Sequence, residues 1–191
     1  RDLAEESVVL SRSENAIIVC ALCTDALAQT PADEAEIYKL VLGAMTFESL
    51  GSPFTRHALS ASTFDPGTFW RSLDEDVIKS VPYLHPRTRL TYARPETVEN
   101  FLEVIAREKP LPKALAKLPG FLLIDRKRAQ SMTARGDWDK FAGDNRLAPG
   151  SVGVSRIGFD KSRSQALVYV IFSCGSVCGH DTFVMLERGG T

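Results

Sequence analysis

The stretch that decides the fold is QALVYVIF, residues 165–172, the most apolar run of the chain. Successive side chains of a β-strand point to opposite faces of its sheet. Both alternating sets are apolar here, one being Ala166, Val168, Val170 and Phe172 and the other Leu167, Tyr169 and Ile171. A strand with two apolar faces is typical of the centre of a sheet that is covered on both sides. We therefore expect residues 165–172 to form a central strand.

Two further stretches flank this strand in the sequence. Residues 153–159 (GVSRIGF) and 182–188 (TFVMLER) are rich in β-branched and aromatic side chains, which favour strands. Residues 160–164 (DKSRS) have the length of a hairpin loop. The C-terminal part of the chain is therefore predicted to be an antiparallel β-meander.

Helical spacing dominates the preceding part of the chain. Apolar residues recur at intervals of three and four over residues 33–48 and again over residues 95–108, where Pro95 suits the first turn of a helix. Residues 69–81 form a weaker third pattern, and residues 121–125 (FLLID) could open a strand. Helices followed by a meander predict an α+β fold, with the N-terminal helices packed on one face of the C-terminal sheet.

Length and charge restrict the function. The chain has 191 residues, of which 44% are hydrophobic, enough for one domain with a real core. Lys and Arg number 23 against 24 Asp and Glu, so we expect no nucleic-acid partner. Apolar runs are far shorter than the roughly 20 residues of a membrane span. No phosphate-binding glycine loop, nucleophile elbow or zinc-protease helix is present, and we expect neither a cofactor nor a metal.

The N-terminal region has the pattern of an export signal. Residues 16–23 (AIIVCALC) are apolar, and Ala26 and Ala28 stand at the small positions that precede a cleavage site. A buried N-terminal helix or strand is the alternative. We expect residues 1–28 to be an upstream extension with a signal peptide, residues 29–191 to be a single domain, and the protein to be periplasmic or extracellular.

The cysteines depend on that cleavage. Removal of residues 1–28 would take away Cys20 and Cys23 and leave Cys174 and Cys178, in the loop SCGSVCGHD at residues 173–181. Two remaining cysteines in an oxidising compartment predict one disulfide. A zinc site of Cys174, Cys178, His180 and Asp181 is less favoured, because no second ligand cluster is visible in the sequence.

Two other interpretations of the loop stay open. Cys178 could be a nucleophile with His180 as its base, because residues two apart in a strand point the same way. Without export, the two cysteines could be ordinary buried thiols. His57 and His85 are isolated histidines, and we expect each to be a capped or solvent-facing side chain.

Residues 137–190 (DWDKFAGDNRLAPGSVGVSRIGFDKSRSQALVYVIFSCGSVCGHDTFVMLERGG) resemble the C-terminal part of a family of uncharacterised bacterial exported proteins. The resemblance lies in the Ser-Arg-x-Gly-Phe strand, the Ala-Leu-Val-Tyr strand and the Cys-Gly-x-x-Cys-Gly loop. It implies export and a C-terminal meander, but it implies no reaction. The family continues into a further strand, so the resemblance implies that this chain is truncated at its C-terminus.

These observations favour an exported, non-enzymatic binding or accessory protein whose ligand is a protein or a small molecule. The alternative is a thiol-dependent or hydrolytic enzyme that uses Cys178 and His180. Neither a ligand nor a catalytic residue follows directly from the sequence.

Overall fold

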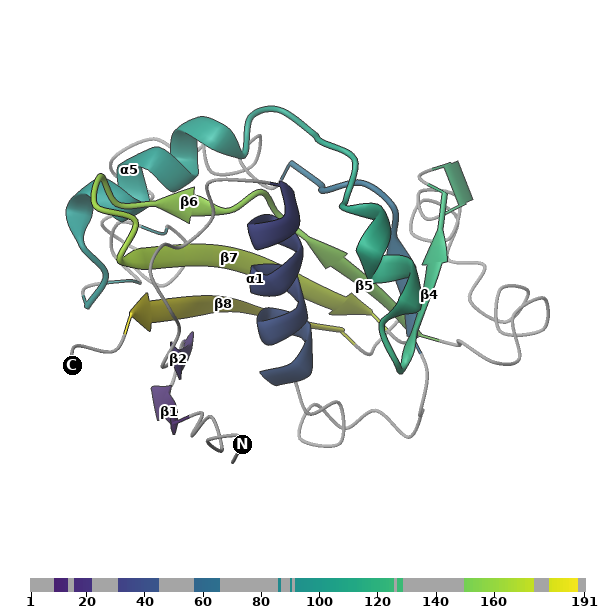
Figure 1. Cartoon of the computed structure of the whole chain (residues 1–191), viewed down its shortest axis with the longest axis horizontal. Coiled ribbons are helices and arrows are strands. Elements are labelled where there is room, and N and C mark those ends of the chain that lie inside the picture. Colours follow the sequence, from purple (N-terminus) through teal and green to yellow (C-terminus); the bar gives the residue numbers. More distant parts are fainter. Residues whose placement is uncertain are drawn as a thin grey trace, which may run out of the picture.

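The computed structural model consists of one mixed β-sheet with helices packed on it (Figure 1). The structure describes residues 9–13, 16–21, 31–44, 57–65, 86, 90, 92–125, 127–128, 150–173 and 179–188. The helices in the described part are α1 (Pro31–Ala44), α5 (Pro95–Val104) and the 3-10 helix η3 (Lys113–Lys117). The strands are β1 (Val9–Ser13), β2 (Ala16–Ala21), β3 (His57–Ser60), β4 (Phe121–Ile124), β5 (Gly150–Val154), β6 (Gly158–Phe159), β7 (Gln165–Ser173) and β8 (Gly179–Arg188). The α+β class is confirmed. The helix predicted over residues 69–81 lies outside the described residues.

The order of the strands corrects the expectation of an antiparallel sheet. It is β1-β2-β8-β7-β5-β3-β4, and β6 also pairs with β7. Strands β5, β6 and β8 are each antiparallel to β7, as a meander requires. However, β3 is parallel to both β4 and β5, and β2 is parallel to β8. Parallel neighbours need long crossover connections, which are supplied by the segments that hold the helices.

The C-terminal hairpins follow the prediction closely. Phe159 pairs with Ala166 across the loop of residues 160–164, and Ser173 pairs with Gly179. The strand expected over residues 153–159 is broken into β5 and β6. Beside the break, the hydroxyl of Ser155 accepts a hydrogen bond from the backbone amide of Tyr169 at 2.9 Å. The Ser155 hydroxyl thus accepts the hydrogen bond that a backbone carbonyl would accept in a regular antiparallel pair, and the regular pairing with β7 is interrupted at Ser155.

Helices lie on both faces of the sheet, where the sequence predicted helices on one face. The even-numbered residues of β7 share a core with one side of α1, made of Ile37, Tyr38, Val41 and Leu42. On the other face, Leu167 packs with Phe101 of α5 and with Phe183 and Met185 of β8. Figure 1 shows α1 crossing in front of β7 and β8. The doubly apolar pattern of β7 thus predicted a central strand correctly. The second apolar set is covered at Leu167, but Ile171 near the end of the strand is 38% exposed.

Helix α5 approaches the sheet closely at β6. A Cβ atom added to Gly158 would lie 2.4 Å from the Cβ of Phe101, so only glycine fits there. The side-chain oxygen of Asn100 accepts a hydrogen bond from the amide of Phe159 at 2.9 Å. The ring of Phe101, fully buried, meets the ring of Phe183 edge-on with centroids 5.9 Å apart. These contacts place the start of α5 beside the hairpin loop of residues 160–164.

Strand β2 coincides with the apolar run that the sequence analysis assigned to a signal peptide. It lies next to β8, with a register that runs from Ala16 opposite Phe183 to Ala21 opposite Arg188 (Figure 1). This pairing is seen with residues 1–28 still attached. Cleavage after Ala28 stays a prediction. No helix in the described part of the chain is long and apolar enough to cross a membrane.

Candidate functional site

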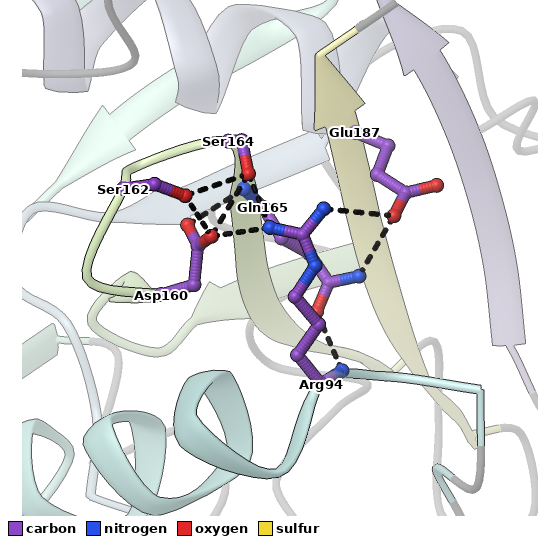
Figure 2. Close-up of polar contacts among 6 residues, drawn as sticks. All are labelled: Arg94, Asp160, Ser162, Ser164, Gln165 and Glu187. Atoms are coloured by element: carbon purple, nitrogen blue, oxygen red, sulfur yellow. Dashed lines mark hydrogen bonds and ion pairs between the residues drawn. The ribbon is translucent and has the colours of Figure 1, made fainter.

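The most connected group of polar side chains lies where α5, the β6–β7 loop and the end of β8 meet (Figure 2). We call this group the Asp160 cluster. Arg94 directly precedes α5, Gln165 begins β7, and Glu187 lies near the end of β8. The complete cluster consists of Arg94, Asp160, Ser162, Ser164, Gln165 and Glu187.

Asp160 is the centre of the cluster. Its Oδ1 accepts the backbone amide of Gln165 at 2.9 Å, and its Oδ2 accepts the hydroxyls of Ser162 at 2.5 Å and Ser164 at 2.8 Å. Arg94 Nη1 lies 2.5 Å from the same Oδ2. The Asp160 side chain is 0% exposed, and such burial alone would raise its pKa. The hydrogen bonds from Ser162, Gln165, Ser164 and Arg94 outweigh burial and hold the pKa at about 2.

The loop that carries Asp160 is a tight hairpin turn. The amide of Arg163 donates to the carbonyl of Asp160 at 3.0 Å, and the amide of Asp160 donates to the carbonyl of Gln165 at 3.2 Å. Arg163 has a φ of 53°, in the left-handed region that favours glycine. Its guanidinium lies 5.0 Å from the centre of the Phe159 ring, within range of a cation–π contact. This turn directs the Asp160 carboxylate inward.

Arg94 links the helix to the sheet. Its backbone amide donates to Gln165 Oε1 at 2.8 Å, and its Nη1 also donates to the hydroxyl of Ser164. Its Nη2 is 3.9 Å from Glu187 Oε1, which accepts a hydrogen bond from Gln165 Nε2 at 3.1 Å. The Arg94 side chain is 44% exposed while Asp160 is covered. The cluster therefore ties the first residue before α5 to both β7 and β8.

The chemistry available to this cluster is structural. A serine nucleophile needs a neighbouring base that can take its proton near neutral pH. The hydroxyls of Ser162 and Ser164 both donate to Asp160, whose pKa of about 2 makes it a poor base. What the arrangement does well is to neutralise a buried carboxylate and hold three elements together.

A second polar group joins α1 to the opposite face. The hydroxyl of Tyr38 donates to the carbonyl of Ser155 at 3.0 Å, and Lys109 Nζ lies 2.7 Å from a carboxylate oxygen of Glu34. Burial raises the pKa of Tyr38 well above its usual value; Glu34 raises it further and Arg156 opposes it. The phenol therefore stays protonated and acts as a donor to the backbone.

The structure brings only part of the predicted loop site into view. Cys174 and Cys178 lie outside the described residues, and their disulfide stays a prediction. His180 and Asp181 are exposed on β8, opposite Phe172 and Ile171. Adjacent residues of a strand point to opposite faces, which disfavours a metal site that uses both. Within the described ranges, no group of three or more His, Cys, Asp or Glu side chains could hold a metal ion.

His57 corrects the expectation of a capped or solvent-facing histidine. It begins β3 and is 1% exposed, with its ring centroid 5.2 Å from that of Phe172 in an edge-on contact and 6.4 Å from that of Phe121. A Cβ atom on Gly150 of the neighbouring strand would come within 2.9 Å of His57 Nδ1. His57 is therefore a packed core residue. His85 lies outside the described residues.

Sequence reasoning missed the Asp160 cluster. The loop DKSRS was predicted correctly, but Arg94 stands 66 residues before Asp160 and no local pattern connects the two. Comparison of the chain with protein-family models, with curated proteins and with solved structures gives no match.

Proposed function

We propose that this chain is an exported bacterial protein with a non-enzymatic binding or accessory role. The observation that carries the non-enzymatic part is geometric: the polar atoms of Asp160 and Tyr38 are used in hydrogen bonds that hold helices to the sheet. The pKa of Asp160 is held at about 2, and burial raises that of Tyr38. General acid–base catalysis favours pKa values near the working pH, and both groups are displaced away from it.

The geometry around these two groups supports the same proposal. Asp160 and Tyr38 each connect a helix to the sheet, on opposite faces, through hydrogen bonds to neighbouring elements. Their shifted pKa values are therefore explained by packing, and no reaction is needed to account for them. A rigid frame of this kind suits a protein that presents a surface to a partner.

Export is supported by the pattern of residues 16–28 and by the cysteine count. Fractionation of a two-membrane bacterial host that produces the C-terminally tagged chain tests it. We expect the tagged protein in the periplasm, with Gln29 as its first residue by N-terminal sequencing. Ile18→Arg, which places a charge in the apolar run, should leave an unprocessed precursor, while the matched Ile18→Leu variant should be processed normally. Full-length wild-type protein confined to the cytoplasm would contradict export.

Thiol counting separates the binding protein from the thiol enzyme. Periplasmic protein, denatured without reductant, should contain no reactive thiol if Cys174 and Cys178 are paired. The matched Cys174→Ser variant should then contain one. A reactive thiol in the wild-type protein would contradict the disulfide and favour catalysis by Cys178, and loss of that protein's turnover in His180→Ala would identify the base.

A further inference from the structure

Strand β8 has the character of a strand that needs a neighbour on both edges. Residues 182–186 are all buried, so both of its alternating faces are covered. Acidic residues stand only toward its ends, Asp181 near the start and Glu187 near the finish. A long apolar edge strand with so few charges recruits other strands, and proteins normally cover such an edge.

The two edges of β8 are covered in different ways. On one edge, β7 pairs along the whole strand as the other half of a hairpin. On the other edge stands β2, parallel to β8 from Ala16 opposite Phe183 to Ala21 opposite Arg188. Strand β2 belongs to residues 1–28, which the proposed export would remove. Cleavage after Ala28 would therefore open this edge of β8 and leave its backbone groups along residues 183–188 without their neighbour.

We propose that the β8 edge opposite β7 is a strand-acceptor site, filled by β2 in the whole chain and by an extended apolar segment of another protein after export. The proposal rests on the proposed export only for the change of occupant. The chemistry of the occupant follows from β2, whose sequence AIIVCA is uncharged and apolar on both alternating sets. In such strand addition, main-chain hydrogen bonds supply affinity and the neighbouring side chains supply selectivity.

A second copy of this chain fits the edge less well. Two copies related by a two-fold axis would pair β8 with β8 in the antiparallel sense. With Val184 opposite itself at the middle of the strand, Asp181 of each copy would face Glu187 of the other. Like charges directly opposite each other destabilise a strand pair. The segment that does occupy the site runs parallel to β8 and carries no charge.

The full-length chain tests the site directly. The probe is a fluorescent peptide of residues 14–23 with serine at Cys20 and Cys23, and binding is followed by anisotropy. Ile18→Pro removes a backbone amide from β2 and should release this strand from β8. We expect Ile18→Pro to bind the peptide at least about tenfold more tightly than wild type, because the internal competitor is lost. Ser11→Pro, the matched change in the outer strand β1 at the residue opposite Ile18, should bind as wild type does.

Several outcomes would overturn the proposal. Equal peptide affinity in Ile18→Pro and wild type, with near-native circular dichroism in both, would show that β8 accepts no strand. If Ile18→Pro fails to fold, Ile18→Asp, which keeps the backbone amide, takes its place in the same comparison. A peptide that carries proline at the Ile18 position should not bind, and equal binding of the two peptides would point to nonspecific adsorption.

The exported protein separates this inference from the proposed function. Protein that begins at Gln29 and binds the peptide supports both. Processed protein that stays monomeric and does not bind would overturn the acceptor site while export stands. An unprocessed chain would overturn export, and the Ile18→Pro comparison would still decide the site. A processed protein that forms dimers which the peptide dissociates would assign the edge to a second copy and overturn the choice of partner.

Discussion

The two strands that pair with β8 lie at very different distances from it in the sequence. Strand β7 precedes β8 directly, and residues 174–178 connect the two in an antiparallel hairpin. Strand β2 comes from the start of the chain and lies parallel to β8, with most of the sequence between them. A hairpin closes a short loop, whereas the β2 pairing must close a loop of the whole domain, at a larger entropic cost.

Side-chain anchoring increases this difference. On the β7 side, the Asp160 cluster joins the ends of β7 and β8 to the residue before α5. The buried rings of Phe101 in α5 and Phe183 in β8 pack there with the half-buried ring of Tyr169 in β7. For β2, the described contact with β8 is the pairing of the strands. Strands β7 and β8 therefore form one structural unit, whereas β2 is joined to β8 by strand pairing, as the proposed acceptor site requires.

Loss of the aromatic contacts among β7, β8 and α5 should reduce stability the most. Phe183 of β8 lies against Phe101 of α5 and against Tyr169 of β7, whose ring centroid is 4.9 Å away. Phe183→Ala should lower the free energy of unfolding by about 4 kcal/mol, because a cavity replaces a fully buried ring. Chemical denaturation measures this loss. Thr182→Val, the neighbouring control, should change it by about 1 kcal/mol or less; similar losses in both would contradict the proposed core.

Loss of the hydrogen bonds in the Asp160 cluster should have the second largest effect on stability. Asp160→Ala should cost about 3 kcal/mol in the free energy of unfolding, because the guanidinium of Arg94, the amide of Gln165 and two serine hydroxyls lose their acceptor. Ser162→Ala removes a single donor and should cost about 1 kcal/mol. Equal losses in the two variants, measured by denaturant titration, would show that Asp160 is not the centre of the cluster.

The pH dependence of stability tests the contribution of the ionised Asp160 carboxylate. Its pKa in the folded protein is about 2, below the value of about 3.9 expected in the unfolded chain. A depressed pKa stabilises the fold above the unfolded value, and this contribution, about 2 kcal/mol, is lost as pH falls from about 4 to about 2. Asp160→Asn lacks a titrating group. The stability difference between wild type and Asp160→Asn should therefore shrink across this range; a constant difference would contradict the assigned pKa.

Amide hydrogen exchange compares the two edges of β8 in the folded protein, and the expected difference is the smallest of the four. Along a strand, successive backbone amides point alternately to the two neighbouring strands. We expect the amides of residues 183–186 that face β2 to exchange with deuterium about tenfold faster than those that face β7, because β2 can leave without unfolding the domain. Ile18→Pro should abolish protection of the first set alone. Equal protection of both sets in wild type would show that β2 is as firmly held as β7.

Local pattern predicted the elements that depend on nearby residues. The double apolar period identified β7, Pro95 marked the first residue of α5, and FLLID located β4. Strand β3 was missed because HALS is too short to show a period and begins with a histidine that turned out to be buried. The run AIIVCA has the composition of a signal core and of a buried strand alike, so its sequence could not distinguish them.

The Asp160 cluster shows the same division. The hairpin loop of residues 160–164 follows from its length and its position between two strands, and it was predicted. The role of Asp160 depends on Arg94, which precedes α5, and α5 packs closely against the hairpin at Gly158. A contact between segments so far apart leaves no period in either of them.

From the sequence alone, residues 165–172 follow as a central strand of a C-terminal meander, because side chains alternate along a strand and both sets are apolar. Only the tertiary structure decided that α1 and α5 take opposite faces and that a parallel strand lies beyond β8. The physical reason is that hydrophobic burial is non-directional: it requires that an apolar face or edge be covered, and the packing of distant segments selects what covers it.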